Sequence, residues 1–386
     1  MAGWQSGHAA DCKSVYAGSI PTPASSDQRN PANFCSLNSM PSRAFGWITA
    51  IALLIGAPAS WGAEPPDGKA LAAELFTYLG LDQASRGQLE NSQVVLNGLS
   101  KAERLPDEIV AAGAMLIVKA PQAAVVIDAF LHSETFQRIF QVRRQAVKGE
   151  AAELAAFNTL PIPEPNRLRD IVSAPARYMN LSKSEAETLK SLNTTSDDLQ
   201  TRFRTALAQI LIARLNAYAS QGLAGVQPYV RDNGSVLNPA SELSNAIRSL
   251  AFLADEFPSF LDTLGKPSGA ASSAPVRNYF WMERRVDKEN VLALSVEERQ
   301  RQAKAAVGAD VHFYASRDYN SMLTLVGVVP YGEDWMVFAI NHTFTDQVTG
   351  FGSGVRRAVG RDLVATELGK QLAETRRRLT GSPAQR

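Results

Sequence analysis

Four short segments rich in β-branched and aromatic residues dominate the last third of the chain, at 290–296, 309–316, 321–329 and 335–345. Turn signals separate them, and Pro330-Tyr-Gly-Glu-Asp334 predicts a hairpin between the third and the fourth. After Gly354, apolar residues at helical spacing continue almost to the C-terminus. This region therefore predicts an antiparallel sheet followed by a long terminal helix.

Strands are also expected in the N-terminal part of the chain. Residues 93–99 and 108–118 are rich in β-branched residues and are separated by a polar turn that contains proline, which predicts a second hairpin. Pro121 suits the first position of a helix, and Val125, Val126 and Phe130 would form part of its apolar face. The order strand, strand, helix is therefore expected here.

Helices are expected in the middle of the chain. Ser182 and Glu185 have the spacing of a capping box, and apolar residues at helical spacing run from Leu199 to Tyr218 and stop before Gly222. Asn238-Pro239 is typical of the start of another helix. The predicted fold is α+β: residues 64–140 and 276–380 form one domain, 141–265 are a helical insertion, and 266–275 are a linker.

An export signal is expected from Met40 to Ala63. Arg43 precedes the apolar run Trp47–Ile55, and Ala57-Pro58-Ala59 is an A-x-A cleavage site, with Ala63 as an alternative. The run has nine residues, fewer than the about 20 that cross a bilayer core. We therefore expect a signal peptide rather than an anchor, and a periplasmic or secreted protein whose mature chain begins near Glu64.

Residues 1–39 are expected to be a spurious or disordered leader. The stretch from Trp4 to Ala24 resembles a tRNA gene read as protein, because Gly18-Ser-Ile-Pro21 can be encoded by a sequence that contains the T-loop signature. Cys12 and Cys35 are the two cysteines of the chain. Both precede Met40, so we expect a mature protein without thiols or disulfides.

Composition narrows the function classes. The mature part would have about 320 residues, enough for a full hydrophobic core. The formal net charge of +1 gives no electrostatic reason to expect nucleic acid as a partner. His132, His312 and His342 lack the spacing of a metal motif, so no metal or other cofactor is predicted.

Two resemblances add to this interpretation. Phe313-Tyr-Ala-Ser316, Val337-Phe-Ala-Ile-Asn341, Asp346 and Gly350–Arg357 resemble a family of uncharacterised exported bacterial proteins, which implies no particular activity. That family often has a cysteine before the central helix; Leu192–Asp197 has none, which argues against a redox role. The element order also resembles helix-grip proteins such as START-like lipid-binding domains, in which the last helix closes a groove over a curved sheet. The alternative is an ordinary α+β sandwich with a filled core.

The strand around His342 supplies the candidate ligand-binding and catalytic residues. Because side chains alternate along a strand, Phe338, Ile340 and His342 share one face and Asn341 lies on the other. Together with Leu363 of the terminal helix, the first three would line a ligand groove. His342, Asn341 and Asp346 are weak candidates for hydrolysis, although the chain has no G-x-S-x-G elbow around Ser353.

A glycine-rich loop before the terminal helix is a candidate anion site. Gly352, Ser353, Gly354 and Arg356 lie between a strand and a helix, where backbone N–H groups can hold an anion. The alternative is a plain turn with Ser353 as the N-cap of the helix.

Three functional hypotheses follow, of which a non-enzymatic one is favoured. The first is binding of a lipid or another apolar or amphipathic small molecule, which a cavity beside the last helix would support. The second is an esterase-like hydrolase that uses His342, which a serine within hydrogen-bond reach of that histidine would support. The third is an envelope-associated partner-binding protein, which a filled core would support.

Overall fold

The computed structural model describes residues 69–91, 93–98, 109–119, 122–131, 143–147, 153–267, 275–286, 289–302, 304–346 and 353–380. All of them belong to the unit Ala63–Arg386. The predicted leader, the signal peptide and both cysteines lie outside the described residues, as does most of the predicted linker.

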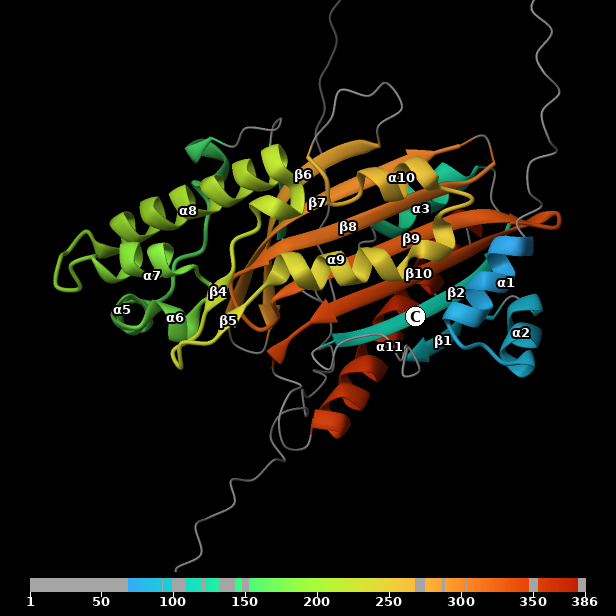
Figure 1. Ribbon diagram of the computed structural model, residues 1–386, viewed down its shortest axis with the longest axis horizontal. Coiled ribbons are helices and arrows are strands. Elements are labelled where there is room, and N and C mark those ends of the chain that lie inside the picture. Colours follow the sequence, from blue (N-terminus) through green and yellow to red (C-terminus); the bar gives the residue numbers. More distant parts are fainter. Residues whose placement is uncertain are drawn as a thin grey trace, which may run out of the picture. The chain divides into compact units, whose positions relative to one another are not determined.

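The predicted α+β fold is confirmed, with an antiparallel sheet, a helical segment and a long helix near the C-terminus (Figure 1). The described strands form an eight-stranded sheet in the order β1-β2-β10-β9-β8-β7-β6-β3, and every neighbouring pair in it is antiparallel. Its strands are β1 (Val95–Gly98), β2 (Ile109–Val118), β3 (Arg143–Val147), β6 (Val276–Val286), β7 (Glu289–Arg301), β8 (Ala306–Ala315), β9 (Ser321–Tyr331) and β10 (Asp334–Phe344). The short strands β4 (Tyr229–Val230) and β5 (Val236–Leu237) form a separate hairpin.

Both predicted hairpins of the large sheet are present. Strands β1 and β2 pair antiparallel, and β9 turns into β10 through Gly332, whose φ of 63° suits a residue without a Cβ. Strand β10 joins the two hairpins because its other edge pairs with β2 along its full length, from Trp335 opposite Val118 to Phe344 opposite Ile109. The N-terminal hairpin is therefore an extension of the C-terminal meander.

Helices cover both faces of the sheet, so the strands are buried on both sides. On β10, Phe338 and Ile340 join a core with α1, α8 and α9, whereas Val337 and Ala339 join a second core with α3 and α11. In Figure 1, α9 and α10 run across the front of the sheet, and α3 and α11 lie behind it. The described helices are α1 (Lys69–Tyr78), α2 (Gln83–Glu90), α3 (Ala123–Leu131), α5 (Pro165–Ser173), α6 (Pro175–Tyr178), α7 (Lys183–Lys190), α8 (Leu199–Gln221), α9 (Pro239–Ser249), α10 (Pro258–Thr263) and α11 (Ser353–Thr380), with 3-10 turns η1 (Leu154–Phe157), η2 (Gly222–Gly225) and η3 (Ala251–Leu253).

Local sequence signals explain where several helices begin and end. The capping box at Ser182 and Glu185 is present at the start of α7, and Asn238 caps α9 by accepting a hydrogen bond from the Ser241 N–H. Helix α8 ends at Gly222 with a φ of 62°.

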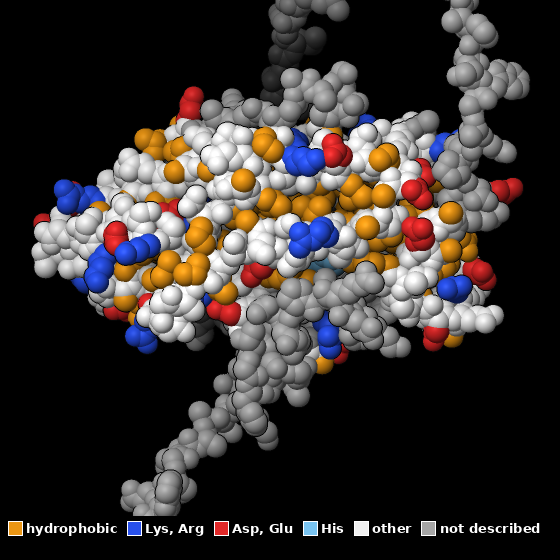
Figure 2. All heavy atoms as spheres, in the orientation of Figure 1, with side chains coloured by type: hydrophobic (Ala, Val, Ile, Leu, Met, Phe, Trp, Pro, Cys, Tyr) orange, Lys and Arg blue, Asp and Glu red, His pale blue; other side chains and the backbone are white. Residues whose placement is uncertain are grey.

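Seen from the side of α9 and α10, apolar side chains reach the surface in the strip between these two helices (Figure 2).

Helix α11 presents a different side to the sheet than the sequence pattern suggests. The sequence pattern predicts a buried stripe of Val355, Val359, Leu363, Leu368 and Leu372. Leu368 and Leu372 are buried as predicted, together with Ala365, Gln371 and Thr375, but Val359 and Leu363 are 47% and 44% exposed. The side chain of Val355 lies outside the described residues. The expected stripe mixed steps of four and five residues, and a five-residue step rotates by about 140° away from the preceding position. Small residues bring the helix close to the sheet: a Cβ on Gly369 would lie 2.7 Å from a methyl carbon of Leu96 in β1.

Two strands of the large sheet were not expected from the sequence. Strand β6 pairs with β7 along 11 residues, and β3, which lies within the predicted helical insertion, pairs with β6 at the edge of the sheet. Across the described residues, no helix has both the length and the apolarity needed to cross a membrane.

Candidate functional site

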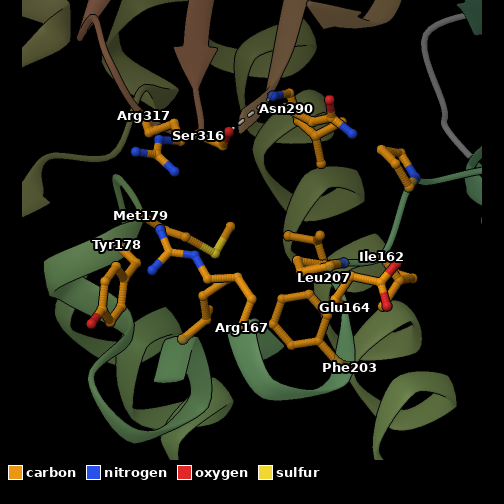
Figure 3. A pocket seen from close by; sticks show the side chains of 14 residues that line it. Ile162, Glu164, Arg167, Tyr178, Met179, Phe203, Leu207, Asn290, Ser316 and Arg317 are labelled. Atoms are coloured by element: carbon orange, nitrogen blue, oxygen red, sulfur yellow. Dashed lines mark hydrogen bonds between the residues drawn. The ribbon is translucent and has the colours of Figure 1, made fainter. Parts of the chain in front are cut away.

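A pocket of about 470 Å³ lies where α5, α6 and α8 meet the ends of β7 and β8 (Figure 3). Its volume is within the range of about 300–1,000 Å³ that is typical of small-molecule sites. The pocket is lined by Pro161, Ile162, Pro163, Glu164, Arg167, Ile171, Tyr178, Met179, Phe203, Leu207, Asn290, Leu292, Ser316 and Arg317. No part of this site was predicted from the sequence.

The floor of the pocket is apolar. Helix α8 supplies Phe203 and Leu207, which are spaced by one helical turn, and α5 supplies Ile171. Met179 and Leu292 add a thioether and a branched side chain, and all five residues are buried. An alkyl or aromatic group placed here would lose contact with water, which is the main source of affinity for apolar ligands.

Charged and aromatic side chains form the rim. The Arg167 guanidinium carbon lies 4.3 Å from the centre of the Tyr178 ring, a cation–π contact that orients the arginine. Arg317 contributes a second guanidinium from the β8–β9 turn. In Figure 3 both guanidinium groups lie on one side of the cavity and the Glu164 carboxylate lies on the other.

The turn that carries Ser316 and Arg317 is held firmly. Asn180 donates through its side-chain amide to the carbonyls of Ala315 and Tyr319, at 2.9 Å each, and through its backbone N–H to the carbonyl of Ser316 at 2.7 Å. Asp318, next to Arg317, has a φ of 69°, the left-handed region that a non-glycine residue occupies only where its surroundings enforce it. The backbone of Arg317 is therefore held in place by its neighbours, and its Nε lies 3.5 Å from Oδ1 of Asp318.

Asp346, a candidate for hydrolysis, belongs to the polar network behind this turn. Its carboxylate accepts a hydrogen bond from Nε of Arg231 at 3.1 Å, and Arg231 also donates to the side-chain oxygens of Asn180 and Asn320. Glu242 accepts hydrogen bonds from the Asn320 amide and from the Ser321 hydroxyl. Asp346 therefore ties the end of β10 to the β4–β5 hairpin and is not bonded to His342.

His342 is fully buried on the face of the sheet that α1 and α9 cover. Its Nε2 lies 3.0 Å from the Tyr78 hydroxyl, which lies 3.2 Å from the hydroxyl of Ser249. Burial lowers the pKa of His342 to about 4 and raises that of Tyr78 to about 12, so both side chains are neutral near pH 7. Tyr78 separates Ser249 from His342, so this serine is not hydrogen-bonded directly to the imidazole.

The other predicted groove residues do not converge on His342. Phe338 packs across Gly327 and meets Phe252 edge-on at a centroid distance of 6.5 Å, and Ile340 is part of the same core. Leu363 belongs to α11, which packs on the opposite face of the sheet. Phe338, Ile340 and His342 therefore do not form one groove with Leu363, because the sheet separates them.

Asn341 also faces away from His342. It donates to the Thr324 hydroxyl at 2.8 Å and accepts from the Thr343 hydroxyl at 2.7 Å, on the α11 side of the sheet. Asn341, His342 and Asp346 therefore have separate partners. In the candidate anion loop, Gly352 and the side chains of Ser353 and Arg356 lie outside the described residues, while the backbone of Ser353 and Gly354 begins α11.

Two further polar clusters are buried in the sheet. Glu298 of β7 is buried beside Arg277, with 3.1 Å between Oε2 and Nη2, and burial raises its pKa to about 7 despite the neighbouring cation. His312 lies on the other face, where its Nδ1 is 2.7 Å from the Tyr319 hydroxyl and its Nε2 is 3.5 Å from Oδ2 of Asp310. Within the described residues, no three metal-ligating side chains are grouped.

No protein-family model, curated protein or solved structure matches the chain. The function is therefore inferred from the geometry of the pocket.

Proposed function

We propose that the protein binds an amphipathic small molecule in the pocket between α5, α6, α8 and the ends of β7 and β8. The observation that carries the proposal is the combination of a buried apolar floor with a charged rim in one cavity of about 470 Å³. Small-molecule sites typically have this composition, a mostly apolar lining with a few polar or charged groups that orient the ligand.

The position of the pocket supports the same conclusion. Its two walls come from the helical segment and from the sheet, and sites between such substructures are common in ligand-binding proteins. The turn on the sheet side is anchored by Asn180, so a ligand would meet a rim that is already ordered. Preorganisation of this kind reduces the entropy lost on binding.

The experiment fills the pocket with a larger side chain and measures how much the binding of an apolar dye weakens. Ile162 lines the cavity, whereas Leu154, earlier in the same segment, is exposed and outside it. Binding of the neutral dye Nile red, followed by fluorescence, should weaken about tenfold or more in Ile162→Trp and stay unchanged in Leu154→Trp. Equal binding by both variants, with unchanged circular dichroism, would contradict the proposal.

We further propose that the protein acts outside the cytoplasm, after export. The support is the basic residue, short apolar run and A-x-A site between Met40 and Ala63. N-terminal sequencing of protein from the periplasmic fraction should begin at Ser60 or Glu64. A product that keeps the segment Met40–Ala59 would contradict this part of the proposal.

A further inference from the structure

The charged residues of the pocket rim indicate which class of ligand the pocket would bind. Among the residues that line the cavity, the charged ones are Arg167, Arg317 and Glu164, which leaves one net positive charge. The two cations come from elements that are far apart in the sequence, α5 and the β8–β9 turn. Glu164 is exposed and occupies the N-cap position of α5, where a carboxylate also favours the positive end of the helix dipole.

The two arginines are oriented toward the same side of the cavity. Figure 3 shows both guanidinium groups on the side opposite Glu164, with Tyr178 beside Arg167. Tyr178 also contacts Arg177, whose guanidinium carbon lies 5.7 Å from the ring centre. The Nε of Arg317 lies 3.5 Å from Oδ1 of Asp318, so this end of the pocket holds three guanidinium groups and one carboxylate. Guanidinium groups are the side chains best suited to bind carboxylate and phosphate oxygens.

Ser316 adds a hydroxyl at the same end of the turn. Its Oγ accepts a hydrogen bond from the Leu292 N–H at 2.9 Å, which fixes the oxygen and leaves the hydroxyl proton as a donor. Leu292 itself lines the apolar floor. The polar side chains of Ser316 and Arg317 therefore lie directly beside the apolar floor. A ligand whose polar head contacts them would place the adjoining part of its chain on Leu292.

From this arrangement we infer that the ligand is an anionic amphiphile whose carboxylate, sulfate or phosphate head lies between Arg167 and Arg317 and whose apolar chain lies on Phe203 and Leu207. The inference rests on the proposed binding function and names the chemical class of its ligand. Each charge-assisted hydrogen bond contributes enough to favour the anion over a neutral analogue by about tenfold or more.

The test compares three probes that share one alkyl chain and differ in the head: dodecanoate, dodecanol and dodecyltrimethylammonium. The two ionic probes are used below their micelle concentrations and dodecanol below its solubility limit. Isothermal titration calorimetry on the full mature chain should give the tightest binding for dodecanoate, about tenfold weaker binding for dodecanol and none for the cation. Added salt should weaken dodecanoate and leave dodecanol unaffected.

Three variants assign the effect to the rim. Arg167→Gln and Arg317→Gln should each reduce the preference for dodecanoate over dodecanol while the Kd of dodecanol stays the same. Arg169→Gln is the matched control, because Arg169 is in the same helix, is exposed, donates to Asn166 and does not line the cavity. It should behave like the wild type.

The outcomes separate the two proposals. If dodecanol and dodecanoate bind the wild-type protein equally well, the anionic head is wrong and small-molecule binding stands. If the preference for dodecanoate persists in both arginine variants, the head does not lie between Arg167 and Arg317. If none of the three probes binds but Nile red does, the ligand class is overturned and small-molecule binding stands. If Nile red does not bind the wild-type protein either, both proposals are overturned.

Discussion

Leu363 and Leu372 lie on opposite sides of helix α11, separated by about 2.5 helical turns. Leu363 is 44% exposed, whereas Leu372 is fully buried against the sheet. The pair therefore distinguishes the side of the helix that stabilises the fold from the side that faces outward.

Leu372→Ala should lower the free energy of unfolding by about 2–5 kcal/mol, because it leaves a cavity in a closely packed contact. Leu363→Ala should change it by less than about 0.5 kcal/mol, as is usual for exposed sites. Urea denaturation of both variants checks this. A large loss at Leu363 would show that α11 is rotated relative to the arrangement described above.

Opposite pH dependences are expected from Glu298 and His342. The pKa of His342 falls from 6.5 to about 4 on folding, so between these values the unfolded chain holds a proton that the folded chain lacks. Stability from this group is present above pH 6.5 and is lost as the pH falls toward 4. The pKa of Glu298 rises from 4.5 to about 7, so its contribution is lost as the pH rises through that window.

Substitution should expose each dependence separately. In Glu298→Gln the free energy of unfolding should rise with pH between 4 and 6.5, and in His342→Gln it should fall between 4.5 and 7. Each slope is at most about 1.4 kcal/mol per pH unit. Urea titrations at several pH values measure it, and identical profiles for the two variants would contradict the assignment.

The ion pair of Arg214 and Glu185 is expected to behave differently from surface pairs. Both side chains are largely buried, and the Glu185 carboxylate also accepts the Ser182 N–H of the capping box. Glu185→Ala should cost about 3–5 kcal/mol because it leaves the Arg214 charge buried. Adding Arg214→Met should restore part of that loss. Asp198→Ala, which removes the exposed pair with Arg202, should cost at most about 1 kcal/mol. Thermal and urea unfolding check the series.

Tyr78→Phe should destabilise the protein by about 1–3 kcal/mol, because it removes the hydroxyl that His342 and Ser249 share and leaves the imidazole Nε2 buried without that partner. Thr77→Val, at an exposed neighbouring position of α1, is the control and should have little effect. Nitrogen NMR of the imidazole should also show a changed tautomer balance in Tyr78→Phe. An unaltered spectrum and stability would mean that the hydroxyl does not bond to His342.

Signals that act over a few residues were readable from the sequence. Ser182 and Glu185, Asn238 and the hairpin at Gly332 each depend on neighbours within the same turn, so pattern alone located them. Strand β6 was missed because Glu283, Arg284 and Arg285 interrupt its apolar residues. The α11 stripe was assigned from apolar residue types without a consistent helical period, which placed Leu363 on the wrong side.

The pocket was beyond the reach of such patterns. Arg167 and Arg317 come together only because the helical segment packs against the end of the sheet, and neither has a local motif that marks it as a rim residue. Glu298 is similar, since nothing in its sequence neighbourhood distinguishes a buried carboxylate from the exposed ones. Alternation on β10 did predict that His342 and Asn341 point to opposite faces, and this prediction is confirmed.

The order of strands in the sheet has a consequence for how the chain acquires its structure. Strands β1 and β2 are made early, but β2 pairs along its length with β10, which is made last before α11. The ten residues of β2 are all buried in the finished sheet. Until β10 has been made, one edge of this apolar strand has no partner and is prone to aggregation. Because β2 and β10 lie far apart in the sequence, their pairing predicts slow folding after synthesis is complete. The large sheet is therefore expected to close only once β10 has been made, which is compatible with the export proposed above, because a chain without its closing strand can still pass through a translocation channel.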